Sequence, residues 1–161
     1  WYLIGPFPGR HGRGLFENVR HPPEDAVLLD AVYYGKDKRL LRWEYVSETG
    51  YPLWPRDQDE DAIWYGYTEV LMDRERDLTM WVGADDDVQI HVNDRLVWKG
   101  GNVNKQWFFS TVYDTRQPYD RQYNRTEGMT TVRMRKGRNK IFFKLSNGPN
   151  KGFISIVLTP G

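Results

Sequence analysis

Apolar residues occupy every second position along much of the chain. Leu78, Met80 and Val82 form one such row. A period of two is typical of β-strands that bury one face against a core. Further strand candidates lie at residues 40–46, 62–72, 88–92, 132–135, 140–145 and 152–158. The last of these is apolar at nearly every position, which favours a central place in a sheet.

Residues that favour tight turns separate these runs. Asn93-Asp94 is spaced for a β-hairpin, and Lys136-Gly137 and Asn147-Gly148-Pro149 supply two more connections. No segment has a sustained helical stripe, although Pro22-Pro23-Glu24-Asp25 has the composition of a helix start. We therefore predict an all-β fold: an antiparallel two-sheet β-sandwich with jelly-roll-like topology, long loops and at most a short helix.

Three segments lack a strand pattern, at residues 9–14, 47–61 and 100–128. The last is long for a compact domain, where loops beyond about 12–15 residues are usually functional or disordered. It is also rich in aromatic residues, which argues against simple disorder. We therefore expect a function to lie in this loop.

The composition limits the classes of protein to consider. The 161 residues include seven Trp, ten Tyr and seven Phe but no Cys, and 23 basic residues nearly balance 22 acidic ones. This length suits a single domain with its own core. The small net charge argues against nucleic acid as a partner, and no apolar run reaches the length of about 18 residues that a membrane span needs.

The sequence has no familiar catalytic motif. Gly-x-Ser-x-Gly, a phosphate-binding glycine loop and His-Glu-x-x-His are all missing from it. Its three histidines are scattered and make no zinc pattern, and His91, on the outward face of its strand, is expected at the surface. We therefore predict that the protein is not an enzyme.

Residues 80–97 have a distinctive order: an apolar strand, a turn with paired aspartates, an alternating strand and a second turn. This order resembles the protective-antigen domain family and the sugar-binding jelly rolls attached to glycoside hydrolases. Residues 132–144 resemble the strand, glycine turn and strand that follow in those domains. Residues 1–7 resemble the opening of jelly-roll modules in bacterial polysaccharide-degrading enzymes. The resemblance implies the sandwich fold and recognition of a carbohydrate.

In some members of these families the paired aspartates hold calcium. The resemblance therefore implies a candidate metal site at Asp85, Asp86 and Asn93, with Asp87 where the families usually have a small residue. No cofactor is required, and calcium is the candidate cation. The alternative is structural: the carboxylates accept hydrogen bonds from backbone N–H groups and fix the turn. A calcium site needs about six to eight oxygen ligands, and this motif supplies only part of them.

The long aromatic loop carries most of the residues that we predict to bind a carbohydrate. Flat rings can pack on the C–H faces of sugars, while Asp, Asn and Arg side chains can hydrogen-bond to hydroxyl groups. The stacking candidates are Trp107, Tyr113, Tyr119 and Tyr123, and the polar candidates are Arg116, Asp120 and Arg121. The same mixture of residues also suits a protein interface.

Trp54, between two prolines, is a further stacking candidate. The alternative for Trp54 is a packed corner of the sandwich, and the sequence favours neither. The charged run at residues 56–61 is typical of a solvated loop.

Together these features predict a non-catalytic carbohydrate-binding module that targets an attached enzyme or surface protein to a polysaccharide, which raises the local concentration of substrate. The alternative is a structural spacer or protein-docking β-sandwich, and a polysaccharide-active enzyme is third. The expected partners are a glycan and a neighbouring catalytic domain of the same chain. Because the sequence starts at Trp1 without a methionine or signal peptide, we expect residues 1–161 to be one module of a longer protein, extracellular or periplasmic.

Overall fold

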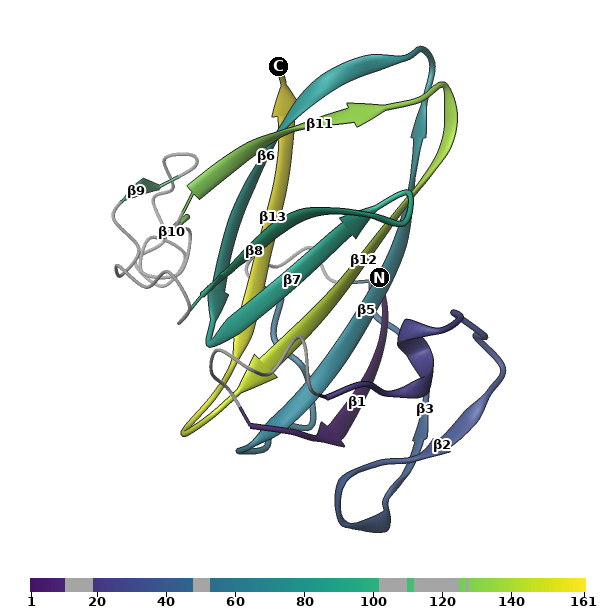
Figure 1. Cartoon of the computed structure of the whole chain (residues 1–161), viewed down its shortest axis with the longest axis vertical. Helices are drawn as coiled ribbons and strands as arrows, with labels where there is room; N and C mark the ends of the chain where they lie inside the picture. Colours follow the sequence, from purple (N-terminus) through teal and green to yellow (C-terminus); the bar gives the residue numbers. More distant parts are fainter. Residues whose placement is uncertain (11–18, 48–52, 102–109, 112–124, 127) are drawn as a thin grey trace.

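A computed structural model describes residues 1–10, 19–47, 53–101, 110–111, 125–126 and 128–161 (Figure 1). These ranges form β-strands and two one-turn 3₁₀ helices. The elements are β1 (Tyr2–Pro8), η1 (Pro22–Glu24), β2 (Val32–Tyr34), η2 (Lys36–Lys38), β3 (Leu40–Arg42), β4 (Glu44–Tyr45), β5 (Ala62–Met72), β6 (Arg76–Asp85), β7 (Asp87–Val92), β8 (Arg95–Gly101), β9 (Ser110–Thr111), β10 (Arg125–Thr126), β11 (Gly128–Met134), β12 (Gly137–Asn147) and β13 (Phe153–Pro160). No helix in the described ranges is long and apolar enough to cross a membrane.

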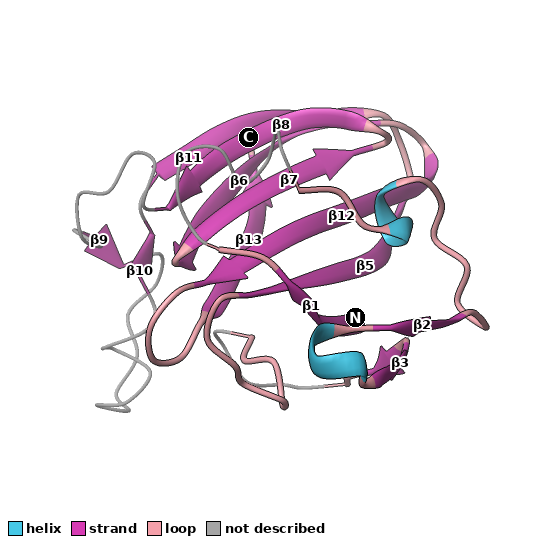
Figure 2. Ribbon diagram, turned by 60° about the horizontal axis from the view of Figure 1, so that its bottom comes forward, coloured by secondary structure: helices cyan, strands magenta, loops and turns pink. Residues whose placement is uncertain are grey.

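Two sheets pack face to face as a sandwich (Figure 2). Among the described strands, one sheet has the order β4-β1-β5-β12-β7-β8 and the other has the order β11-β6-β13. Neighbouring strands are antiparallel throughout both sheets. The predicted all-β sandwich is confirmed, and η1 falls where the sequence has the composition of a helix start.

The core lies between the sheets. Ile141, Phe143 and Leu145, the inward residues of β12, pack in one cluster with Met80 of β6, and all four are at most 1% exposed. Burying one such side chain stabilises the fold by roughly 1.5–3 kcal/mol. Gly66 of β5 makes room for the aromatic ring, because a Cβ at this position would lie 1.9 Å from Cε2 of Phe143.

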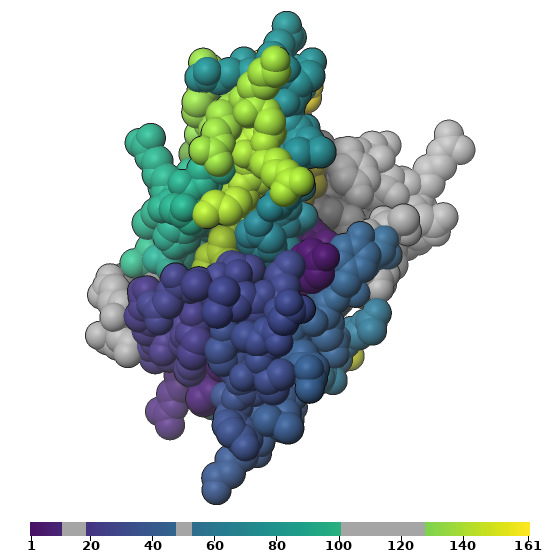
Figure 3. Space-filling model, turned by 90° about the vertical axis from the view of Figure 1, so that its right-hand side faces the viewer, coloured from purple at the N-terminus to yellow at the C-terminus, as the bar shows by residue number. Residues whose placement is uncertain are grey.

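The opposite face of the six-stranded sheet carries a second apolar cluster. Ile63 and Tyr65 of β5 pack there with Leu41 and Trp43 from the segment 19–45. Figure 3 shows this segment as dark-blue atoms that cover the lower half of the face in view. The six-stranded sheet is therefore covered on both faces, by the second sheet on its inner face and in part by this segment on its outer face.

A buried ion pair fastens the segment to the sheet. Lys144 is 1% exposed; its Nζ lies 3.0 Å from Oε2 of Glu24 and donates a hydrogen bond to the carbonyl of Val19. Tyr65 donates its hydroxyl hydrogen to the same carboxylate at 2.6 Å, and the backbone N–H of His21 donates at 3.2 Å. Burial lowers the pKa of Lys144 although Glu24 opposes this, and burial together with Glu24 raises the pKa of Tyr65.

The last strand, β13, is not central as its apolar sequence predicts. Among the described strands it lies at the edge of the three-stranded sheet. Leu53 bridges its outer side: the N–H of Leu53 donates to the carbonyl of Ile154 at 2.8 Å, and the N–H of Ile154 donates back at 3.0 Å. This bridge and the sandwich interior bury Ile154, which explains an apolar sequence in an edge strand.

The segment predicted as a loop, 100–128, contains strand pairing at its described positions. The strand β8 extends to Gly101, and β11 begins at Gly128. Between them β9 pairs with β10, with Ser110 opposite Thr126. Two-residue strands of this kind have too few residues to show a periodic pattern in the sequence.

Candidate functional site

A broad hollow, here called the end hollow, lies at the end of the sandwich where β6 leads into β7. Its volume is about 620 Å³, which is within the range of ligand sites. It is lined by Trp54, Gln58, Asp59, Glu60, Asp85, Asn150, Lys151 and Phe153. Trp54 and Asp85 are residues that the sequence singles out for different reasons, one as a stacking ring and one as a paired aspartate.

An aromatic pair forms the apolar part of the end hollow. The rings of Trp54 and Phe153 pack with centroids 5.0 Å apart and an interplanar angle of 49°. Phe153 is buried, whereas Trp54 is partly exposed. Phe153 is also paired with Asp85 across β13 and β6, so strand register places the rings beside a carboxylate. Trp54 therefore packs at a corner and also lines a hollow, and its role as a stacking residue stays a prediction.

Hydrogen bonds fix the walls of the end hollow. The side-chain amide of Gln58 donates to the carbonyl of Gly152 at 3.0 Å, and its Oε1 accepts from the N–H of Gly152 at 2.9 Å. Asn147 donates its amide to the carbonyl of Asp59 at 2.7 Å. The charged run 56–61, predicted as a solvated loop, is thus tied to the turn between β12 and β13.

Asp59 is a carboxylate of the end hollow that two basic side chains pair with. Its Oδ1 lies 3.2 Å from Nζ of Lys36, and its Oδ2 accepts a hydrogen bond from Arg39. Burial by itself raises the pKa of Asp59, but the hydrogen bonds from Lys36 and Arg39 outweigh this and lower the pKa. The walls therefore present carboxylate, amide and ammonium groups around an apolar surface, which suits a ligand with many hydroxyl groups.

The paired aspartates have different surroundings. The peptide bond between Asp85 and Asp86 is cis. Asp85 lines the end hollow, whereas Asp86 is 6% exposed and its Oδ2 accepts a hydrogen bond from the N–H of Gly148 at 2.5 Å. Asp86 thus accepts a backbone hydrogen bond, as the structural alternative expects, but from the turn between β12 and β13 and not from its own turn.

Asn93 does not belong to the same site, and its predicted place with Asp85 and Asp86 is wrong. It lies at the opposite end of β7, about 20 Å away at roughly 3.4 Å per residue. There its Oδ1 accepts from the N–H of Lys140 and its amide donates to Asn139, both at 2.9 Å. The φ angles of Asn93 and of its successor are 49° and 66°, which fit the predicted hairpin turn.

A complete calcium site is not present among the described residues. No group of three or more His, Cys, Asp or Glu side chains lies together there in a way that could hold a metal ion. Calcium is coordinated by about six to eight oxygen ligands, and the side chains of Asp85 and Asp86 alone cannot supply that number. Calcium at Asp85 and Asp86 therefore stays a prediction.

The other predicted sugar-binding residues lie outside the described residues: Trp107, Tyr113, Arg116, Tyr119, Asp120, Arg121 and Tyr123. The described ends of this segment can still be placed. The β9–β10 pair brings Thr111 beside Arg125. Gly128 pairs with Val82, and β10 lies beside β6 beyond that pair, toward Asp85. The described strands β9 and β10 therefore lie near the same end of β6 as the end hollow.

Sequence reasoning missed Phe153, Asn150 and Lys151 as residues of the end hollow. Phe153 is hidden in an apolar run, and the other two follow a turn that looks like an ordinary connection. The signal that could have found them is strand register, because β13 runs antiparallel to β6 and begins where β6 ends.

Comparison with known proteins finds structural similarity to part of one enzyme and no match of sequence. No protein family model matches the sequence, and no curated protein matches it. Among solved structures, the chain is similar to part of β-glucosidase from Kluyveromyces marxianus. In its complex with glucose the match covers 99% of this chain and 15% of the enzyme, with 8% identity and a TM-score of 0.49. In the selenomethionine-labelled enzyme the match covers 62% of this chain and 11% of the enzyme, with 12% identity and a TM-score of 0.47. The chain thus spans a small part of that enzyme's length.

Proposed function

We propose that the chain is a non-catalytic carbohydrate-binding module and that the end hollow is part of its glycan-binding surface. The observation that carries the proposal is that Trp54 and Asp85 line the same hollow. Trp54, held against Phe153, offers a flat apolar surface, and the surrounding carboxylate and amide groups can accept or donate hydrogen bonds to hydroxyls. A sugar ring needs both kinds of contact.

The aromatic segment extends the proposed surface. Its described flanking strands, β9 and β10, lie near the same end of β6, which supports a contribution from its stacking and polar residues to binding of the same polymer. In the parent protein the module would hold an attached catalytic domain or a surface protein close to a secreted or cell-surface polysaccharide. The proposal requires no cofactor.

Retention on insoluble polysaccharides tests this function. We expect the chain to bind at least one of cellulose, β-1,3-glucan, mannan and xylan, and Trp54→Ala to weaken binding about tenfold, or about 1.4 kcal/mol. Tyr34→Ala, which removes an exposed ring from β2, is the matched control and should bind normally. Absence of retention by the folded chain on all four polymers would contradict the proposal, and release of sugar products would indicate an enzyme instead.

A protein-docking role is the second candidate, and one specific feature favours it. The β2–β3 hairpin exposes three apolar side chains: Val32 is 40% exposed, Tyr34 75% and Leu40 64%. Tyr34 and Leu40 are opposite each other in the hairpin. Exposed apolar groups gathered on one face suit contact with a neighbouring domain of the same polypeptide. Failure to bind glycans, together with loss of a domain contact in Leu40→Ser, would favour this function.

A further inference from the structure

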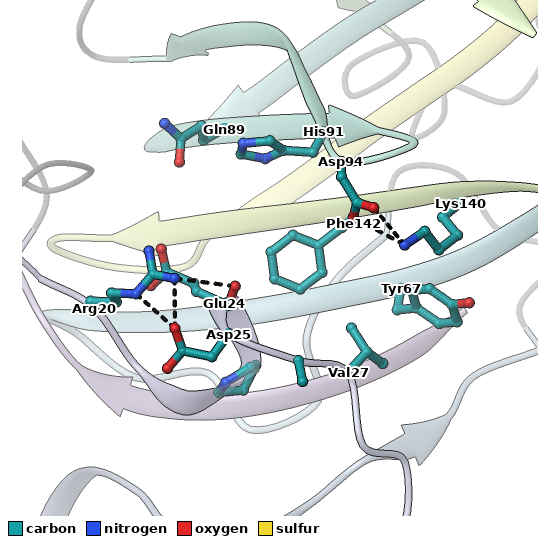
Figure 4. A pocket seen from close by; sticks show the side chains of 12 residues that line it. Arg20, Glu24, Asp25, Val27, Tyr67, Gln89, His91, Asp94, Lys140 and Phe142 are labelled. Atoms are coloured by element: carbon teal, nitrogen blue, oxygen red, sulfur yellow. Dashed lines mark hydrogen bonds and ion pairs between the residues drawn. The ribbon is translucent and has the colours of Figure 1, made fainter.

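A second hollow, here called the outer hollow, lies between the six-stranded sheet and residues 20–27 (Figure 4). Its volume is about 740 Å³. Three neighbouring strands form its floor with their outward side chains: Tyr67 of β5, Phe142 of β12, and Gln89 and His91 of β7. None of these residues lines the end hollow. The two hollows can therefore be tested separately.

Neighbouring side chains on the same face of the sheet hold the apolar part of this floor in place. The ring of Phe142 stacks on that of Tyr65, with centroids 5.7 Å apart and an interplanar angle of 21°. Tyr67 donates its hydroxyl hydrogen to Glu69 at 2.7 Å, and burial is the main cause that raises the pKa of Tyr67 to about 12. The floor thus presents a fixed aromatic surface that is uncharged at neutral pH.

The charged residues at the rim are paired with each other. Nη2 of Arg20 lies 2.6 Å from Oδ1 of Asp25, and Nζ of Lys140 lies 2.8 Å from Oδ2 of Asp94. Figure 4 shows these two pairs at opposite ends of the hollow, with Phe142 between them. The charges of each pair offset each other, so the rim has no net charge to attract a charged ligand, and the floor between the pairs favours an uncharged one.

Two groups of the floor have hydrogen-bonding capacity to spare. Nδ1 of His91 is buried and has no hydrogen-bond partner among the described residues. Two positions away on the same strand face, the amide of Gln89 forms no hydrogen bond within those residues either. Burial lowers the pKa of His91, so its imidazole is neutral at pH 7, with one donor and one acceptor nitrogen. Gln89 is half-buried and lines the hollow, so its amide can reach a ligand with hydroxyls. The unsatisfied ring of His91 beside it also favours a polar partner at this floor.

We propose that the outer hollow binds an uncharged glycan, with the C–H face of a pyranose ring on Phe142 and its hydroxyls hydrogen-bonded to Gln89 and His91. A neutral sugar combines a flat apolar face, several hydroxyl groups and no charge, which are the three properties of this floor. The inference depends on the proposed function for the class of ligand, but not on the end hollow. Two sites on one domain would increase the avidity for a polymer.

An NMR titration of the 161-residue chain tests the second site. The probes are cellobiose, laminaribiose, mannobiose and xylobiose, with digalacturonic acid as the charged comparison. We expect at least one neutral disaccharide to cause saturable shifts of the Gln89 side-chain amide and the His91 ring, and digalacturonic acid to cause none there. Gln89→Ala and His91→Ala should each weaken this binding about tenfold, which is the loss of about one good hydrogen bond.

Two controls separate this site from the end hollow. Thr131→Ala, at an exposed position of β11 in the other sheet, should leave the titration unchanged. Trp54→Ala should weaken binding only at the end hollow. If neutral disaccharides shift only signals around Trp54, the outer site is wrong while the proposed function stands. If digalacturonic acid binds the outer hollow more tightly than the neutral sugars, or if no disaccharide shifts its signals, the inference is also wrong. Circular dichroism of each variant verifies that it is folded.

Discussion

The six-stranded sheet is covered on both faces, but by different kinds of contact. Its inner face meets the three-stranded sheet through apolar side chains such as Phe143 and Met80. Its outer face meets segment 19–45 through aromatic packing and through the buried pair of Lys144 and Glu24. Apolar contact is non-directional, whereas hydrogen bonds and ion pairs require a specific geometry.

The difference matters for the proposed sites. Apolar burial is enough to hold the two sheets together. It does not by itself fix one position of a layer, because many relative positions of two packed layers bury similar apolar areas. The outer hollow, however, has residues 20–27 as one wall, and this wall must keep a fixed position over the floor. We infer that the Lys144–Glu24 pair holds residues 20–27 in place over the floor. The inner core contributes most of the free energy of folding.

Replacing Phe143 with alanine should have the largest effect on stability. The ring is 1% exposed and lies in the inner core, so its loss leaves a cavity. Phe→Ala changes in cores cost about 3–5 kcal/mol of unfolding free energy. Urea unfolding followed by tryptophan fluorescence measures this loss. Met129→Ala, at a position 59% exposed on β11, is the control and should change the free energy by less than about 0.5 kcal/mol.

Glu24→Gln should have the next largest effect, because it leaves the ammonium of Lys144 buried without its carboxylate. Breaking a fully buried pair costs about 3–5 kcal/mol; we expect about 2–3 kcal/mol because the Glu24 side chain is 12% exposed. The double variant Glu24→Gln/Lys144→Met should recover part of the loss. Asp25→Asn, at the exposed neighbouring acid, is the control. A loss no larger than that of the control would show that the pair does not hold the wall.

The inner face could be predicted from the sequence because it depends on periodicity alone. The predicted strand 62–72 coincides with β5, and the predicted turn at Asn93-Asp94 joins β7 to β8. The outer face could be predicted only in part. The alternation in β12 places Lys144 opposite the core, which is correct, but that position normally faces solvent. Its burial depends on a segment more than 100 residues earlier in the chain, which no local pattern specifies.

In the candidate site, too, some features could be predicted from the sequence and others could not. The motif around Asp85 and the isolated ring of Trp54 are visible in the sequence, and the structure brings them together in the end hollow. Asn93 follows the same motif in sequence order, yet β7 carries it to the other end of the strand. Proximity in a β-sandwich is set by register and strand length, so sequence order within a motif does not predict which side chains meet.

Acidification should produce a smaller effect, through His21 on the outer face. Its ring stacks on Phe7 with centroids 4.8 Å apart, and Nε2 donates to the carbonyl of Pro8 at 2.8 Å. Burial is the main influence on its pKa and lowers it below 6.5, although the bond to Pro8 opposes this. The unfolded chain then binds the proton more tightly, so stability falls as the pH drops from about 6.5 toward the folded pKa.

Thermal melts between about pH 7 and about pH 5 measure this effect. The decrease in Tm should be smaller in His21→Gln than in the unaltered chain. His91 has a pKa shifted in the same direction by burial, so His91→Gln should remove a further part of the decrease. An identical pH profile in both variants would mean that neither ring is buried enough in solution to resist protonation.

Arg20→Ala should have the smallest effect on stability, although Arg20 is also part of the wall. Its pair with Asp25 is short at 2.6 Å, but the two side chains are 65% and 69% exposed. Water solvates both ions at this position, and salt screens them, so such pairs contribute little. The Tm should therefore be unchanged within error, at low and at high salt. A decrease in Tm as large as that of Glu24→Gln would contradict this. The exposed Arg20–Asp25 pair, and not the buried Lys144–Glu24 pair, would then hold residues 20–27 in place.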